Sequence, residues 1–250
     1  AAMTKMADGE LSHRIDTAIG QPAAAFNQMA DRIEQLIVGQ RQLVAAISHE
    51  LRTPLTRLQL QAELLELSEH QRNMLQQDIT ELDGLIETLL LSSKLESGSF
   101  ALRKEQLNLW ELLMSTIGEV ELEERELLIK VPKDLVLHAD PLLLKRIFLN
   151  LLTNAQRYTP ADCSIQIAAH AEPQRILIQF QDTGPGVSPE RLEQLFMPFW
   201  RAEQSRSKHT GGHGLGLMLV QRVVSAHGGK VSAKNLQPTG LAIEMTFPLT

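Results

Sequence analysis

The sequence lacks most of the features that mark secreted, membrane-spanning and nucleic-acid-binding proteins. Its single cysteine, Cys163, excludes an intramolecular disulfide and a multi-cysteine zinc site. No apolar run approaches the roughly 18 to 20 residues of a membrane span, so the chain as given is expected to be soluble. The net charge of −6, with no run of Lys or Arg longer than two residues, argues against DNA binding.

The Gly-Lys-Ser/Thr string of Walker-type phosphate loops is also absent, so a bound nucleotide would have to be held in a different way. The overall composition is that of an ordinary globular protein, with 43% hydrophobic and 22% charged residues. A chain of 250 residues is long enough for one or two domains with real cores.

An unusual group of polar residues interrupts a helical pattern at residues 47–58, where the chain reads ISHELRTPLTRL. Pro54 would remove a backbone hydrogen bond and kink the helix, at a cost of roughly 3 kcal/mol or more. His49 and Thr53 share one helix face and Glu50 flanks the histidine. A solvent-facing imidazole beside a carboxylate is a usable nucleophile. The alternative is a histidine that only completes a polar face, next to a tolerated kink.

The first third of the chain has the pattern of two long helices. Apolar residues across 26–65 follow steps of three and four that are typical of a heptad seam, with two successive steps of four near His49 that would turn the helix face. The pattern resumes over 75–89 and ends near Gly98. This predicts an antiparallel helical hairpin that dimerises into a four-helix bundle, because one hairpin cannot bury both apolar faces. A monomeric hairpin packed on the next domain is the alternative.

Residues 106–250 alternate between helical and strand-like patterns. Consecutive strands are joined by short turns, which favours an α+β two-layer sandwich, a mixed sheet with helices on one face, over a doubly wound parallel sheet. The expected helices are 110–124, 141–157 and 215–227, and the expected strands are 127–131, 135–138, 164–169, 175–182, 229–234 and 242–247.

Two glycine clusters in this second part could approach a ligand. The string DTGPG at 182–186 follows a strand, and its glycines allow a tight turn. The string GGHGLGL at 211–217 opens a helix, whose free N–H groups and dipole can bind phosphate. Between them, FMPFWR at 196–201 begins a polar segment that has the composition of a mobile lid hinged at the glycines. Taken alone, each glycine cluster is equally consistent with a simple turn or helix cap.

A polar stripe on the helix at 141–157 gives the glycine clusters a context. Asn150, Asn154, Arg157 and Tyr158 share one face of this helix and its end. Amide oxygens suit a hard cation such as Mg²⁺, and a guanidinium pairs with phosphate, so the stripe suits a magnesium-bound polyphosphate. A merely solvated stripe would normally contain more Glu and Lys.

These motifs resemble those of a known family. The string SHELRTPL resembles the phosphoacceptor box of sensor histidine kinases. The other four motifs resemble the boxes of the ATP-binding domain shared by histidine kinases, gyrase-type ATPases, Hsp90 and MutL, which is known as the GHKL or Bergerat fold. The polar stripe at 150–158 resembles the N box, DTGPG the G1 box, FMPFWR the F box and GGHGLGL the G2 box. Residues 1–30, with the strings MADGEL and AAAFNQMA, resemble the second half of a HAMP connector. The resemblance implies a C-terminal part of HAMP at 1–30, a dimerisation and histidine phosphotransfer hairpin at 31–98, a hinge at 99–105 and a catalytic ATP-binding domain at 106–250.

The resemblance also implies a role for each motif residue. ATP and Mg²⁺ would bind in the second domain, with Asp182 on the adenine amino group and Asn154 on the metal. His49 would be phosphorylated, Glu50 would orient it, and Thr53 would position water for dephosphorylation of the partner. The remaining contacts to phosphates, the magnesium shell or the enclosing loops would come from Asn150, Arg157, Tyr158, Gly184, Gly186, Arg201, Gly212, Gly214, Leu215 and Gly216, with Arg206 and Lys208 as helpers.

A kinase of this type would act as a homodimer and pass its phosphoryl group to an aspartate of a response regulator. By the same resemblance, the chain would be the cytoplasmic portion of a bacterial inner-membrane protein whose membrane segments lie upstream. Two alternatives remain open. In a gyrase-like ATPase, a glutamate base stands at the place of Asn150, and an amide cannot act as that base. The other is a non-enzymatic dimeric scaffold that binds nucleotide. A metal site at His209 and His213, the only histidine pair with ligand-like spacing, is a weaker idea.

Overall fold

The computed structural model describes residues 21–249, except residues 66, 123–124 and 202–212. Most of the HAMP-like segment therefore lies outside the described residues, as do Arg206, Lys208, His209 and Gly212. The chain divides into two compact units, Ala1–Ser93 and Lys94–Thr250, and each is described by itself. No helix within the described part is long and apolar enough to cross a membrane.

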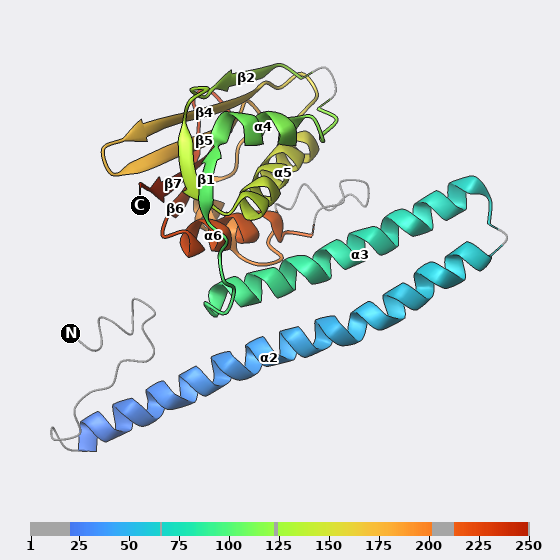
Figure 1. Ribbon diagram of the computed structural model, residues 1–250, viewed down its shortest axis with the longest axis vertical. Coiled ribbons are helices and arrows are strands. Elements are labelled where there is room, and N and C mark those ends of the chain that lie inside the picture. Colours follow the sequence, from blue (N-terminus) through green and yellow to red (C-terminus); the bar gives the residue numbers. More distant parts are fainter. Residues whose placement is uncertain (1–20, 66, 123–124, 202–212, 250) are drawn as a thin grey trace. The chain divides into compact units, whose positions relative to one another are not determined.

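The N-terminal unit is the predicted helical hairpin. Helix α2 (Gln21–Leu64) runs unbroken through Pro54, and α3 (Glu69–Glu96) returns in the opposite direction (Figure 1). The turn before α3 is closed by a capping box. Ser68 accepts a hydrogen bond from the Gln71 backbone N–H at 3.3 Å, and the Gln71 side chain accepts one from the Ser68 N–H at 3.1 Å.

Among the described side chains, the two helices share a small buried cluster. Leu55 of α2 packs with Ile79 and Ile86 of α3, and two partly buried leucines of α3 complete the cluster. A single copy of the hairpin leaves many of its described apolar side chains exposed. They include Leu51, Leu58, Leu60, Leu64, Leu82 and Met74.

The C-terminal unit contains a five-stranded mixed sheet of order β2-β4-β5-β7-β6. Strands β2 and β4 are parallel, and the other neighbours are antiparallel. This confirms the predicted α+β sandwich over the doubly wound alternative. The strands are β2 (Leu127–Lys130), β4 (Ile165–Glu172), β5 (Arg175–Asp182), β6 (Lys230–Asn235) and β7 (Leu241–Pro248).

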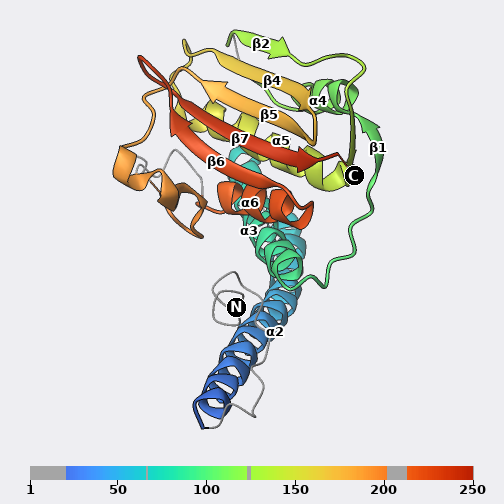
Figure 2. The same ribbon diagram turned by 90° about the vertical axis from the view of Figure 1, so that its left-hand side faces the viewer.

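Three helices cover one face of this sheet: α4 (Leu109–Ile117), α5 (Pro141–Tyr158) and α6 (Gly216–Ala226) (Figure 2). The core lies between the two layers, where Phe148 of α5 meets Phe180 of β5 with ring centroids 5.5 Å apart. Every second residue of β5 is buried against the helices, as expected for a strand with one covered face.

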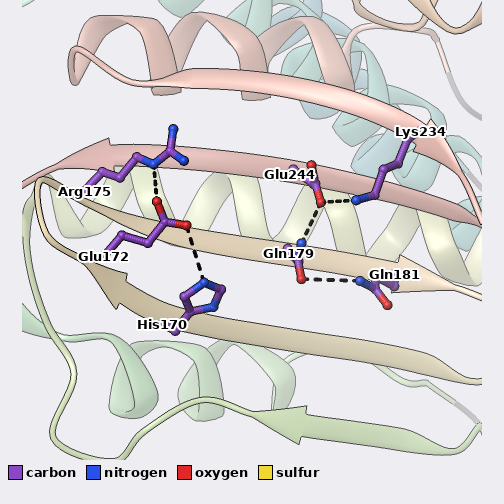
Figure 3. Close-up of polar contacts among 7 residues, drawn as sticks. All are labelled: His170, Glu172, Arg175, Gln179, Gln181, Lys234 and Glu244. Carbon is purple, nitrogen blue, oxygen red and sulfur yellow. Dashed lines mark hydrogen bonds and ion pairs between the residues drawn. The ribbon is translucent and has the colours of Figure 1, made fainter.

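The opposite face of the sheet is polar (Figure 3). Glu172 pairs with Arg175 at the β4–β5 turn, and Glu244 accepts hydrogen bonds from both Gln179 and Lys234. These side chains satisfy one another in or near solvent, so this face needs no second layer of helices.

Three local features differ from the sequence-based expectation. Strand β1 (Glu105–Asn108) was not predicted; it pairs with β3 (Val136–Ala139) in a separate two-stranded sheet. Helix α4 ends at Ile117 instead of near residue 124, because Gly118 caps it through N–H bonds to the last carbonyls. Two 3₁₀ turns, Pro189–Arg191 and Glu193–Phe196, occupy the stretch before the predicted lid.

Candidate functional site

Helix α5 presents the two asparagines from a firmly fixed position. Its N-cap residue, Asp140, accepts hydrogen bonds from the backbone N–H groups of Leu142 and Leu143, both at 3.2 Å, and Pro141 stands at the first helical position. The buried side of α5 is lined with Leu, Ile and Phe side chains that pack on the sheet. The polar stripe therefore flanks the core, with Asn150 and Asn154 half-buried and Arg157 and Tyr158 exposed.

The asparagine pair meets the start of α6. The side-chain amide of Asn150 donates to the Arg146 carbonyl at 2.9 Å. A Cβ atom on Gly216 would lie 3.0 Å from Oδ1 of Asn150 and 3.6 Å from Nδ2 of Asn154. Glycine at this position therefore lets the start of α6 lie close beside the amide of Asn150. The free N–H groups and positive dipole end of α6 favour an anion there.

The DTGPG loop is built around Asp182, the last residue of β5. Its Oδ1 atom accepts a hydrogen bond from the Gly184 N–H at 2.9 Å. Burial raises the pKa of the Asp182 carboxyl, and backbone N–H groups of Gly184 and Leu241 act in the opposite direction. A Cβ at Gly184 would come within 2.6 Å of Cγ2 of Thr159, so this turn requires glycine. The half-buried carboxylate is suited to accept a hydrogen bond from an amino group.

The second glycine of this loop is held by a residue that the sequence analysis missed. Gly186 has φ +69°, and a side chain there would come within 2.8 Å of Oδ1 of Asn235. Asn235 accepts from the Val187 N–H at 3.0 Å and donates to the Val187 carbonyl. Gly240 closes against the same loop, since a Cβ there would lie 2.1 Å from the Asp182 carbonyl oxygen. Both residues come from the β6–β7 hairpin, about 50 positions away, and no local pattern marks them.

The remaining predicted loop residues that the structure describes lie at the start of α6 and just before residue 202. Gly214 has φ +71°, and Leu215 is buried. Arg201 is exposed. Trp200 is anchored by a hydrogen bond of 2.9 Å from its indole N–H to the side chain of Gln194. The structure therefore brings the asparagines together with Gly216, and Asp182 together with Gly184 and Gly186.

The phosphoacceptor motif lies within α2. His49 and Glu50 are in helical backbone, and their side chains are outside the described residues. Thr53 and Pro54, one turn further on, are exposed. Positions 49 and 53 are four residues apart and share one helix face. The Thr53 side chain on this face is open to solvent.

A buried histidine that sequence reasoning also missed links the two helices of the site. Nε2 of His227, directly after α6, accepts the Asp140 backbone N–H at 3.0 Å, so Nδ1 carries the proton and donates to the Val223 carbonyl at 2.8 Å. Burial is the main cause that lowers the pKa of His227. This contact fixes the C-terminal end of α6 at the N-terminus of α5, while Gly216 meets the asparagines at the opposite end of α6.

Two protein families match the two units. Residues 39–98 match the His Kinase A (phospho-acceptor) domain, and residues 139–250 match the histidine kinase-, DNA gyrase B- and HSP90-like ATPase family. Over its full length the chain is 34% identical to the sensor protein RstB of Escherichia coli K12, of which it spans 59%. The chain belongs to the sensor histidine kinases of bacterial two-component systems. It is also 36% identical to the sensor histidine kinase CpxA of Escherichia coli K12, over 90% of the chain and 50% of CpxA.

A solved histidine kinase structure supports the same assignment. Full-length ShkA, in complex with AMPPNP, superimposes with a TM-score of 0.69 at 26% identity, over 83% of this histidine kinase and 45% of ShkA. This histidine kinase thus spans between half and three fifths of the length of RstB and CpxA. A gyrase-like ATPase is not supported, because the relatives that match nearly the whole chain are sensor kinases.

Proposed function

We propose that this histidine kinase binds ATP in its C-terminal unit and transfers the γ-phosphoryl group to His49. Nε2 of His49 attacks the γ-phosphorus in line, a nitrogen–phosphorus bond forms, the bond to the β,γ-bridging oxygen breaks, and ADP leaves. Glu50 orients the imidazole and accepts the proton from its other nitrogen. In such a transfer the protein contributes mainly positioning and charge neutralisation.

One observation supports the ATP site above the others: the amides of Asn150 and Asn154 face Gly216 at the N-terminus of α6. An added Cβ would crowd the Asn150 amide, so glycine lets the N–H groups at the start of α6 and the two amides lie close enough to bind the same phosphates. Asp182, half-buried at the end of β5, accepts a hydrogen bond from the adenine amino group. The AMPPNP in the similar ShkA structure is an ATP analogue and agrees with this use of the fold.

Magnesium fits the same residues. An amide oxygen is an acceptable ligand for a hard cation, and Asn154 would hold the ion on the open side of α5. When bound, Mg²⁺ neutralises charge on the phosphates. Asn150, Arg157 and Tyr158 contribute contacts to the phosphates or to the hydrated ion. The glycines of both loops, with Leu215 and Arg201, enclose the triphosphate.

The phosphorylated histidine serves as the donor for an aspartate in the receiver domain of a response regulator. Thr53, exposed one turn after residue 49, positions a water molecule for the opposite activity, which removes the phosphoryl group from the regulator. The protein is then both kinase and phosphatase.

We also propose that the chain works as a homodimer. A second hairpin in a four-helix bundle would cover part of the apolar surface that α2 and α3 leave exposed. Because the chain spans only part of RstB and CpxA, upstream segments would supply the sensor and the membrane anchor. The chain would then be the cytoplasmic portion of a bacterial inner-membrane protein.

The test is incubation with γ-labelled ATP and Mg²⁺, beside His49→Gln and, as a matched control, His70→Gln, which changes an exposed histidine of α3. Label that is acid-labile, alkali-stable, absent from His49→Gln and kept in His70→Gln is the expected result. A nucleotide titration on the same samples separates the rival function. Tight Mg-ATP binding without any label would indicate a nucleotide-binding scaffold.

A further inference from the structure

Arg125, just before β2, donates several hydrogen bonds to the C-terminal end of α5, about 30 positions further along the chain. Nη1 donates to the Thr159 hydroxyl at 2.6 Å, the Pro160 carbonyl at 3.0 Å and the Ala155 carbonyl at 3.3 Å. Nη2 donates to the carbonyls of Gln156 at 2.9 Å and Thr159 at 3.1 Å. One half-buried guanidinium thus binds the helix end through both of its terminal nitrogens.

These acceptors include the Gln156 carbonyl in the last turn of α5, where carbonyls lack the usual donor four residues further along the helix. A cation at this end also opposes the negative end of the helix dipole. Arg125 therefore holds the turn of α5 that contains Asn154 and Arg157. Without it, the Gln156 carbonyl would lose its bond to the guanidinium, whereas the Ala155 carbonyl would keep the bonds from the Thr159 N–H and hydroxyl, so this end of α5 would be held less firmly.

The same contacts extend to the adenine-binding loop through Thr159. The Thr159 hydroxyl accepts from Arg125 and donates to the Ala155 carbonyl at 2.6 Å, which leaves its methyl group directed at Gly184. Gly184 in turn donates its N–H to the carboxylate of Asp182. A single chain of contacts therefore runs from Arg125 through Thr159 and Gly184 to Asp182.

We propose that Arg125 is a positioning residue for the nucleotide. By fixing the end of α5 and, through Thr159, the loop at Asp182, it sets the spacing between the group that binds the phosphates and the group that binds adenine. This inference rests on the proposed function of the site. It predicts a loss of ATP affinity, not of the phosphoryl-transfer step itself, because the hydrogen bonds of Arg125 go to residues 155–160 of its own unit.

The test uses the full chain and the variants Arg125→Gln, Arg125→Lys and Arg175→Gln. Arg175→Gln is the matched control, since Arg175 is exposed on the polar sheet face and bonds to Glu172 (Figure 3). We expect Arg125→Gln to raise the Kd for Mg-ATP and the KM for ATP about tenfold, a factor that corresponds to 1.4 kcal/mol. The labelling rate at saturating ATP should change much less. Arg125→Lys should restore part of the affinity, because an ammonium keeps the charge and some donors but not the planar fork.

Two variants at Thr159 test the contact chain if Arg125→Gln does not fold. Thr159→Val keeps the methyl group near Gly184 and removes the hydroxyl, whereas Thr159→Ser keeps the hydroxyl and removes the methyl group. Each should weaken ATP binding. Unchanged affinity in both, or in a folded Arg125→Gln, would overturn the inference while the proposed function stands. An equal loss in Arg175→Gln, or a lower maximal rate at unchanged KM, would also overturn it. If the wild-type chain bound no Mg-ATP, both proposals would fall.

Discussion

The backbone N–H of Phe199 donates a hydrogen bond of 2.9 Å to the carbonyl oxygen of Gly214. The two residues flank the segment 202–212, which lies outside the described part of the chain, and the bond joins the backbone on either side of it. Both residues have positive φ, +60° at Phe199 and +71° at Gly214. A backbone hydrogen bond therefore connects the FMPFWR string to the residues just before α6.

The first prediction concerns Gly214→Ala. An added Cβ would lie 2.5 Å from the Trp200 carbonyl oxygen and 2.7 Å from the Phe199 carbonyl carbon, and both neighbours are backbone. The left-handed conformation adds roughly 1 to 2 kcal/mol for a residue with a side chain. Relief of this clash moves the start of α6, so Mg-ATP should bind at least about tenfold more weakly, a factor that corresponds to 1.4 kcal/mol. Nucleotide titration measures it.

Gly84→Ala provides the control for that substitution. Gly84 lies in α3 with nothing within 4 Å of an added Cβ, so alanine should raise the unfolding free energy by up to about 1 kcal/mol and leave ATP affinity unchanged. Equal ATP affinity in Gly214→Ala and wild type would show that the hydrogen bond between Phe199 and Gly214 does not affect phosphate binding.

Asn154→Ala is expected to abolish Mg-ATP binding without unfolding the chain. Asn154 is half-buried on the open flank of α5, and alanine is the better helix former, so the helix itself should not suffer. Titration with nucleotide in the presence and absence of Mg²⁺, with a thermal melt on the same sample, measures both effects. Thr153→Ala is the neighbouring control, because its hydroxyl bonds only within α5, to the Leu149 and Asn150 carbonyls. If Asn154→Ala kept its affinity for Mg-ATP, the proposed role of Asn154 as a magnesium ligand would be wrong.

Local patterns were enough to predict most elements of the C-terminal unit. Strand β5 begins and ends at the predicted residues, because its alternating apolar side chains have one covered face and one polar face. Helix α5 was predicted to within one residue, since Asp140 and Pro141 mark its start. The glycines at 184 and 186 were singled out for tight turns, and the structure gives each a neighbour that a side chain would strike.

Features that depend on distant partners could not be predicted in the same way. Strand β1 has only four residues and exists because β3 pairs with it. Arg125, Asn235 and His227 are ordinary polar residues in the sequence, and their partners lie about 30 to 90 positions away. A single sequence does not indicate which distant carbonyl or N–H group a side chain will bind. The roles of His49 and Glu50 likewise stay predictions.

Thr53→Ala should separate the two proposed activities. Thr53 is exposed in α2 and is not needed for the nucleophile, so autophosphorylation with labelled ATP should persist. Loss of the hydroxyl removes the group that positions water, and release of phosphate from a phosphorylated response regulator should fall by at least about tenfold. Thr56→Ala, also exposed and about one turn further along α2, is the control and should retain both activities. If phosphatase activity survives in Thr53→Ala, the assignment of Thr53 is wrong.

The last prediction concerns the pH dependence of stability through His227. The folded state holds this imidazole neutral, since Nε2 accepts the Asp140 N–H, and burial, opposed mainly by the Val223 carbonyl, lowers the pKa of His227 below its ordinary value near 6.5. Lys104 and His138 lower the pKa further and Asp140 raises it. Below pH 6.5 the unfolded chain therefore binds a proton that the folded chain does not. Stability from this group is fully present above pH 6.5 and falls with decreasing pH until the folded-state pKa is reached, with a slope of at most about 1.4 kcal/mol per pH unit.

Urea unfolding of the full chain between pH 5 and 8 measures this slope. His227→Gln cannot titrate at this position, so the variant should be less stable at pH 8 and should lose less stability than wild type between pH 6.5 and 5. His70→Gln, which changes an exposed histidine of α3, should retain the wild-type slope. Parallel pH profiles for wild type and His227→Gln would mean that protonation of this buried imidazole does not limit the stability of the α5–α6 pair. In that case the loss of stability at low pH would have to come from carboxylates, which titrate at lower pH.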